Sequence, residues 1–284
     1  MRNKLFIIVL VVGFLGVAIL EGLPTRFGQW VGEEKGWRDL LKSVPIPESL
    51  PGPLRGPLDS SDVNLTVSGV IEHTNKQREL YNQVPLHSNK KLTLAAEAKL
   101  EDMFKQQYFE HESPDGKRPA DVIKAAGYEY IVVGENLALG NYENDQILVE
   151  AWMNSPGHRA NILDGKFDEI GVAVGKGMFE GKEIWLAVQE FGAPLSICPS
   201  SGQSLKYQIE DNKDAIGRLE NELSAEKKKI DGNNYPSREA YDRAVDSYNT
   251  KANKLNSLVD QTRDLVDMYN KTVTEFNKCL EMNA

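Results

Sequence analysis

Apolar residues in the C-terminal part of the sequence recur at every third or fourth position over two long segments, and this pattern constrains the fold most strongly. The polar stretch DGNNYPS, which has the composition of a turn, separates the two segments. An apolar stripe on a long helix needs a partner to be buried. We therefore expect residues 198–284 to form two antiparallel helices packed as a coiled-coil hairpin, with Asn212 on the first seam fixing the register. The apolar positions are Leu205, Ile209, Ile216, Leu219, Leu223 and Ile230, then Tyr241, Ala244, Tyr248, Leu255, Val259, Leu265, Tyr269, Val273, Phe276 and Leu280.

The two cysteines, Cys198 and Cys279, are too few for a disulfide scaffold and have no metal-type CxxC spacing. They flank the predicted hairpin. Its second helix, taken from Arg238 to Cys279, exceeds the first by roughly 24 Å at 1.5 Å per residue. The extended stretch from Cys198 to Leu205 covers roughly 20 Å of that difference. We therefore hypothesise a Cys198–Cys279 disulfide that ties the free end of the hairpin to its base.

The N-terminal residues 1–22 combine the basic stretch MRNK with an apolar run from Leu5 to Leu20. This run is slightly shorter than the roughly 20 residues that span a bilayer. A cleaved signal peptide needs a small-x-small site, and VAILEGLP offers no good one. We favour an uncleaved membrane anchor that keeps Arg2 and Lys4 in the cytoplasm, with a cleaved signal peptide as the alternative. Either route exports the remaining chain to an oxidising exterior, where the disulfide would persist.

Residues 23–62 have the composition of a linker. Pro and Gly alternate in VPIPESLPGPLRGPLDSSD without an apolar period, which predicts an extended spacer. The net charge of −9 leaves no large basic surface, so nucleic acid is not expected as a partner.

Residues 63–197 show helical patterns first and strand patterns later. Helical spacing of apolar residues is found in four stretches, at 67–74, 92–107, 118–127 and 144–155. The runs EIGVAVGKG and KEIWLAVQEFG follow, separated by MFEG, which indicates a β-hairpin. This order predicts a single α+β domain.

Four polar residues of this domain lie at the ends of predicted elements: His111, Glu135, Ser155 and His158. Two His and one Glu match the ligand set of a catalytic zinc site, which leaves a fourth position for water. The simpler interpretation is that each residue is structural. A nucleophilic Ser155 activated by His158 is a third interpretation, although Pro156 and Gly157 interrupt the helical spacing between them.

The ordered stretches GENLALG, AWMNSPGHRANIL, FDEIGVAVG and IWLAVQEFG resemble the bacterial form of the CAP superfamily, also called SCP-like domains. The resemblance covers about Val63 to Leu195. It implies an α-β-α sandwich with one open cleft. The central cavity of these domains usually holds two His and two Glu, which can bind a divalent metal.

Carried over to this sequence, the resemblance places His111, Glu135 and His158 in the cleft. The second Glu is expected three residues after Trp152, where this chain has Ser155. The remaining His-Glu-His set is closer to a zinc site than to a calcium site. The same resemblance places Asn136 and Arg159 beside Ser155 along the cleft, while Trp152, Trp185 and Phe191 are interpreted as core residues.

The resulting expectation is an exported, membrane-tethered CAP-domain protein that binds an envelope protein, lipid or glycan through its cleft. The alternative is a metal-assisted hydrolase of peptide, ester or cell-wall substrates, with Glu135 as general base beside His111 and His158. No specific activity follows from the sequence. The hairpin is expected to pair with another copy or to rest on the domain.

Overall fold

The computed structural model describes residues 50–58, 63–232 and 234–283. The predicted anchor at residues 1–22 and most of the predicted linker lie outside these ranges. Within them, no helix combines the length and the apolar character needed to cross a membrane. The described residues divide into two units: Ser200–Asn277 belong to one, and residues 50–199 belong to the other together with residues 278–283.

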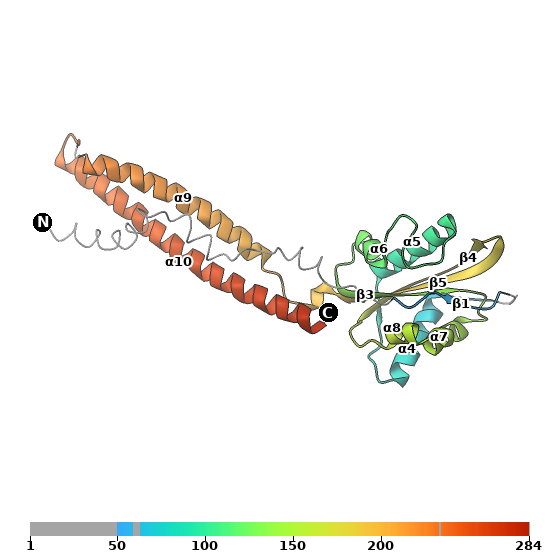
Figure 1. Cartoon of the computed structure of the whole chain (residues 1–284). Helices are drawn as coiled ribbons and strands as arrows, with labels where there is room; N and C mark the ends of the chain where they lie inside the picture. The colour runs from blue at the N-terminus through green and yellow to red at the C-terminus, as the bar shows by residue number, and fades with distance from the viewer. Residues whose placement is uncertain (1–49, 59–62, 233, 284) are drawn as a thin grey trace. The chain divides into compact units, whose positions relative to one another are not determined.

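A five-stranded mixed sheet with the order β1-β3-β5-β4-β2 is the centre of the first unit in the chain (Figure 1). Its three long strands, β3 (Tyr130–Leu139), β4 (Glu169–Phe179) and β5 (Lys182–Pro194), are antiparallel. The predicted hairpin between β4 and β5 forms, with Glu180 and Gly181 in left-handed conformation at its turn. The two-residue strands β1 (Leu54–Arg55) and β2 (His87–Ser88) pair in parallel at the two edges.

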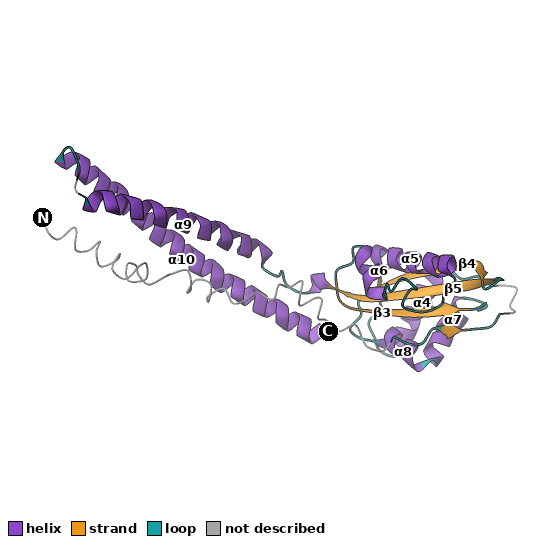
Figure 2. Cartoon of the chain, turned by 45° about the horizontal axis from the view of Figure 1, so that its top comes forward, coloured by secondary structure: helices purple, strands orange, loops and turns teal. Residues whose placement is uncertain are grey.

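Helices cover both faces of the sheet, as Figure 2 shows. One face carries α5 (Lys90–Gln106) and α6 (Pro119–Ala125), and the other carries α4 (Val67–Leu80), α7 (Asp145–Asn154) and α8 (Pro156–Leu163). The structure is therefore the expected α-β-α arrangement.

The long helix α5 approaches the sheet closely because of its small residues and a glycine on the facing strand. Ala95 and Ala96 of α5 are fully buried. A Cβ atom on Gly171 of β4 would collide with the backbone of Leu92, so only glycine fits there.

Trp152 and Phe191 are fully buried core residues, as expected. Trp185, also predicted in the core, is only half-buried. It pairs with Lys176 near the turn of the β4–β5 hairpin.

Residues 50–58, which the sequence places in the linker, belong to the sheet. Leu54 pairs with Ala138 and Arg55 with Leu139 at the outer edge of β3. The Gly56 N–H donates to Leu139 O at 2.8 Å, and the Asn141 N–H donates to Pro57 O at 2.6 Å. The Pro/Gly composition that predicts a spacer also suits an edge strand, because the outer side of such a strand needs no N–H donors.

The second unit consists of α9 (Gln203–Asp231) and α10 (Arg238–Asn283), which pack as an antiparallel hairpin. The contacts run from the start of α9 against the later part of α10: the Asn212 side chain donates to Thr262 Oγ1 at 3.1 Å. Knobs-into-holes packing of a coiled coil stays a prediction. One cluster of buried apolar side chains between the two helices consists of Ile216, Leu219, Leu223 and Leu255.

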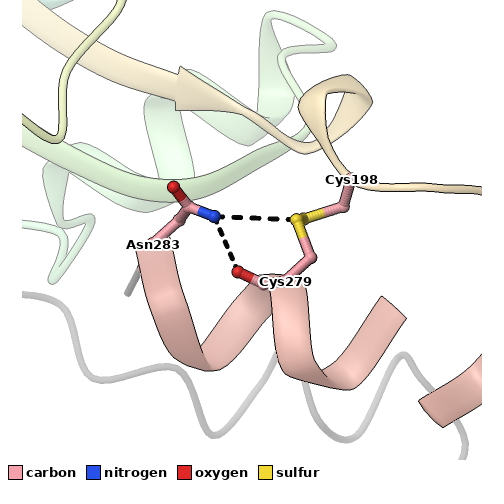
Figure 3. The surroundings of a disulfide bond; sticks show 3 residues. All are labelled: Cys198, Cys279 and Asn283. Carbon is pink, nitrogen blue, oxygen red and sulfur yellow. Dashed lines mark hydrogen bonds between the residues drawn. A yellow bond between two sulfur atoms is a disulfide. The ribbon is translucent and has the colours of Figure 1, made fainter. Parts of the chain in front are cut away.

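The structure contains a disulfide between Cys198 and Cys279, with the two Cα atoms 5.6 Å apart (Figure 3). Asn283, one turn further along α10, donates from its amide to Cys279 O at 2.8 Å. The bond joins the residue that leads into α9 to the last turns of α10. A loop of 81 residues in sequence is thereby closed.

Candidate functional site

His111 is the residue around which the candidate site is built. It lies in the loop after α5, and its Nδ1 is 2.6 Å from Glu135 Oε1 on β3. Its Nε2 is 2.6 Å from the carbonyl oxygen of Pro51 in the edge segment. Both ring nitrogens of His111 are therefore engaged by other parts of the same chain.

The Pro51 contact determines where a proton sits on the His111 ring. A carbonyl oxygen only accepts hydrogen bonds, so Nε2 must carry a hydrogen and donate it. At Nδ1 two forms are then compatible with the geometry. Either a charged imidazolium donates to the Glu135 carboxylate, or a neutral ring accepts a hydrogen from protonated Glu135.

Lys99 on α5 holds the loop that contains His111. Its Nζ is buried on α5 and donates to Glu110 O at 2.8 Å and to His111 O at 2.6 Å. Burial lowers the pKa of Lys99, and the nearby Glu135 and Glu190 carboxyl groups oppose this effect. The lysine thus fixes the loop and offsets negative charge in the site.

Glu190 on β5 is the site residue that the sequence analysis missed. It lies directly opposite Glu135 across the β3–β5 pair, and both side chains are fully buried. Burial raises the pKa of Glu190 well above its ordinary value, and the charge of Glu135 adds to the effect. Neither carboxyl oxygen of Glu190 has a hydrogen-bond partner among the described residues. The neutral acid is therefore the favoured form of Glu190.

A sequence signal for Glu190 existed. The run WLAVQEFG is apolar except for Gln189 and Glu190, and a carboxyl group inside a buried central strand needs a partner.

His158 begins the first turn of α8, and only 1% of its surface is exposed. Its Nδ1 is 2.8 Å from Ser155 Oγ. Burial lowers the pKa of His158 to about 4, and the charge of nearby His111 adds to this effect. His158 is therefore neutral at physiological pH. So low a pKa makes it a weak general base for Ser155.

Asparagines connect α8 to β3. Asn136 donates to His158 O at 3.2 Å, while Asn161 donates to Glu135 O at 3.1 Å and to Asn136 Oδ1 at 3.0 Å. Asn136 is thus a buried structural link rather than a residue lining an open cleft. This network explains how the PGHRANIL stretch is held in place.

Arg159 packs against the end of α4. Its guanidinium carbon is 4.4 Å from the centre of the Tyr81 ring. Its expected place along the cleft stays a prediction.

The expected metal ligands do not form a three-ligand site. Among the residues that the structure describes, no three His, Cys, Asp or Glu side chains are arranged to hold one ion. Both His111 nitrogens already have protein partners, and His158 Nδ1 faces Ser155. The donor set as arranged does not fit a catalytic zinc ion.

The α-β-α sandwich, the pair of His111 with Glu135 on β3 and a second His in the first turn of α8 agree with the CAP-type arrangement that the sequence resemblance implies. Residues 71–191 match the family model described as "CAP: Cysteine-rich secretory protein family". The resemblance to bacterial CAP domains is confirmed over this part of the chain.

Two relatives from Bacillus subtilis (strain 168) share this region. Over 125 residues the chain is 40% identical to "Uncharacterized protein YkwD". The aligned region covers 44% of this chain and 47% of YkwD. The chain is 30% identical over 105 residues to "Uncharacterized membrane protein YlbC", covering 37% of this chain and 30% of YlbC. The chain thus spans less than half the length of either relative.

A solved structure of an extracellular protein containing a SCP domain from Bacillus anthracis is also similar. It is 25% identical with a TM-score of 0.38, over 44% of this chain and 39% of that chain.

Proposed function

We propose that this chain is an exported protein, tethered to the membrane through residues 1–22, whose CAP domain is a binding module of the cell envelope. The Cys198–Cys279 disulfide supports export, because such bonds persist in oxidising compartments. The description of the matched family as secretory agrees with this location, and YlbC is described as a membrane protein.

The engagement of both His111 ring nitrogens is the observation that carries the binding role. His111 is held by Glu135 and Pro51, Glu190 favours its neutral form, and His158 is neutral. Glu135 Oε2, both Glu190 carboxyl oxygens and His158 Nε2 have no hydrogen-bond partner among the described residues. We infer that this polar centre near an edge of the sheet serves recognition of an envelope protein, lipid or glycan.

The metal-assisted hydrolase is the less favoured alternative. It requires His111 to release Pro51 or Glu135 before the ring can act as a ligand. Glu135 as general base would also have to leave its pairing with His111.

The hairpin of α9 and α10 is proposed as a second interaction element, which pairs with another copy or with an envelope protein. Tyr207 and Met268 expose 60% and 55% of their surface, and such apolar side chains suit a contact surface. Analytical ultracentrifugation of the full chain, with and without reductant, measures self-association.

Binding of purified envelope fractions tests the proposal. The full chain would be titrated with vesicles of envelope lipids, soluble wall fragments and an envelope peptide library, with His111→Ala as the variant. We expect saturable binding to one fraction, reduced in His111→Ala. Hydrolysis of a fraction at a rate that depends on added zinc would contradict the binding role and support the hydrolase.

A further inference from the structure

Residues 50–58, called here the edge segment, run as an extended chain along the outer edge of β3. We call its contact surface the binding edge, which consists of His111, Leu139, Gly140, Asn141, Tyr142 and Gly157. Besides the ladder of the paired strands, four hydrogen bonds join the two, and three of them use backbone atoms of the edge segment as acceptors. They are His111 Nε2 to Pro51 O at 2.6 Å, Gly56 N to Leu139 O at 2.8 Å, Asn141 N to Pro57 O at 2.6 Å and Asn141 Nδ2 to Leu58 O at 2.9 Å.

Glycines on both sides allow the edge segment to lie this close. A Cβ atom on Gly157 of α8 would be 2.7 Å from Pro51 Cβ, and one on Gly140 would be 2.9 Å from Gly56 Cα. A Cβ atom on Gly56 itself would collide with the Tyr142 ring. Three glycines from separate parts of the chain thus leave room for one extended strand. The binding edge is shaped for a peptide backbone.

The strand pairing of the edge segment with β3 is short. Only Leu54 and Arg55 pair as a strand, and Leu58 exposes 45% of its surface. Pro51, Pro53 and Pro57 have no N–H to donate.

The binding edge also keeps polar atoms that the edge segment does not satisfy. Asn141 Oδ1 and the Tyr142 hydroxyl have no hydrogen-bond partner among the described residues, and both side chains are more than nine-tenths buried. Asn141 contacts Pro57 and Leu58, and Tyr142 contacts Gly56, so both lie against the edge segment. A strand with an N–H at the Pro57 position offers a donor there, which the resident proline lacks.

We propose that the binding edge is a peptide-binding site, which takes an extended Pro- and Gly-containing segment of an envelope protein as an added parallel strand on β3. The edge segment is the resident occupant and leaves when the partner segment binds. This inference rests on the proposed binding function and names its ligand class. Strand addition of this kind gains affinity from main-chain hydrogen bonds and specificity from a few side chains.

The edge segment indicates what the partner must offer. A carbonyl oxygen at the Pro51 position accepts from His111 Nε2, and glycine is required at the Gly56 position. A basic side chain at the Arg55 position stacks on Phe109, since the Arg55 guanidinium lies 5.2 Å from that ring centre.

The edge segment competes with a free peptide for the binding edge, and this competition can be measured. A covalently attached segment has an effective concentration on the order of 1 mM, so free peptide at lower concentration binds poorly to the wild type. Gly56→Ala loosens the edge segment through its collision with Tyr142 and leaves the binding edge unchanged. Gly52→Ala is the matched control, because a Cβ atom there meets nothing within 4 Å.

The assay is fluorescence anisotropy of a labelled peptide with the sequence of residues 50–58, titrated with the full chain. We expect Gly56→Ala to bind the peptide at least about ten-fold more tightly than the wild type and Gly52→Ala. Adding Gly157→Ala to Gly56→Ala should remove the gain, because it blocks the Pro51 position. A peptide that itself carries Gly56→Ala should not bind.

A second measurement covers the case in which Gly56→Ala folds poorly. Hydrogen exchange of the Gly56 amide in the wild type should accelerate in excess peptide, because displacement breaks its bond to Leu139 O. Equal weak binding by a folded Gly56→Ala and Gly52→Ala, or unchanged exchange, overturns the inference. If an envelope fraction still binds through His111 in that case, the proposed function stands alone; if no fraction binds, both fall.

Discussion

The buried Glu190 side chain makes the stability of the sandwich domain depend on pH, and Glu190→Gln removes this dependence. The folded pKa of Glu190 is raised above its unfolded value, so the folded domain keeps a proton that the unfolded chain releases. The stabilising contribution is complete below the unfolded pKa of about 4.3 and is lost as the pH rises towards the folded pKa.

The size of the change in unfolding free energy follows from the one proton that Glu190 binds. Between the two pKa values the unfolding free energy falls by up to about 1.4 kcal/mol per pH unit because of Glu190. Glutamine does not titrate and has nearly the same size as glutamic acid. The unfolding free energy of Glu190→Gln relative to the wild type should therefore rise with pH, at up to that slope, above about pH 4.3.

His158 changes the stability with pH in the direction opposite to Glu190. Its effect cancels when Glu190→Gln is compared with the wild type. Its folded pKa of about 4 lies below the unfolded value, so its contribution is present above about pH 6.5 and is lost as the pH falls. Because His158 is present in both proteins, it leaves the difference between them unchanged.

Urea unfolding of the full chain, followed by tryptophan fluorescence at several pH values, measures this difference. Trp152 and Trp185 report on the sandwich domain, and no tryptophan lies in α9 or α10. Glu183→Gln is the matched control on the same strand, because Glu183 is exposed. Parallel pH profiles for Glu190→Gln and the wild type would refute a raised pKa at Glu190.

Three further predictions follow from the same contacts. The His158 ring should show no NMR titration above about pH 5, since its pKa is about 4; a midpoint near 6.5 would contradict its burial. Replacing both Cys198 and Cys279 by serine should lower the unfolding free energy of the part that they join by about 2–5 kcal/mol, and an unchanged melting temperature would count against a structural bond. Lys99→Met should lower the unfolding free energy of the sandwich domain by about 1.5–3 kcal/mol, measured by urea unfolding, because two loop carbonyls lose a charged donor; a stabilised variant would contradict this role.

Periodicity predicts the helices and the β4–β5 hairpin because it directly encodes which side chains are buried. The same holds for Trp152 and Phe191, which lie in predominantly apolar segments and are fully buried. The meeting of His111 and Glu135 rests instead on the resemblance to the CAP superfamily, since the two residues are 24 positions apart in different elements.

Features that depend on pairing between distant strands were not predicted. Glu190 faces Glu135 only because β5 pairs with β3 in this register, which the local pattern does not reveal. The edge segment has the composition of a linker, and only its contacts with Leu139 and Asn141 show that it belongs to the sheet. Its place next to His111 is what engages the second ring nitrogen of that histidine, which the sequence pattern leaves available for a metal.

Calorimetric titration of the full chain with zinc tests the central claim most directly, with His111→Ala and His158→Ala alongside. The account predicts no saturable heat in the wild type, because both His111 nitrogens are engaged by Glu135 and Pro51. Stoichiometric binding with a micromolar or lower dissociation constant, lost in both variants, would contradict it and make the site a metal centre.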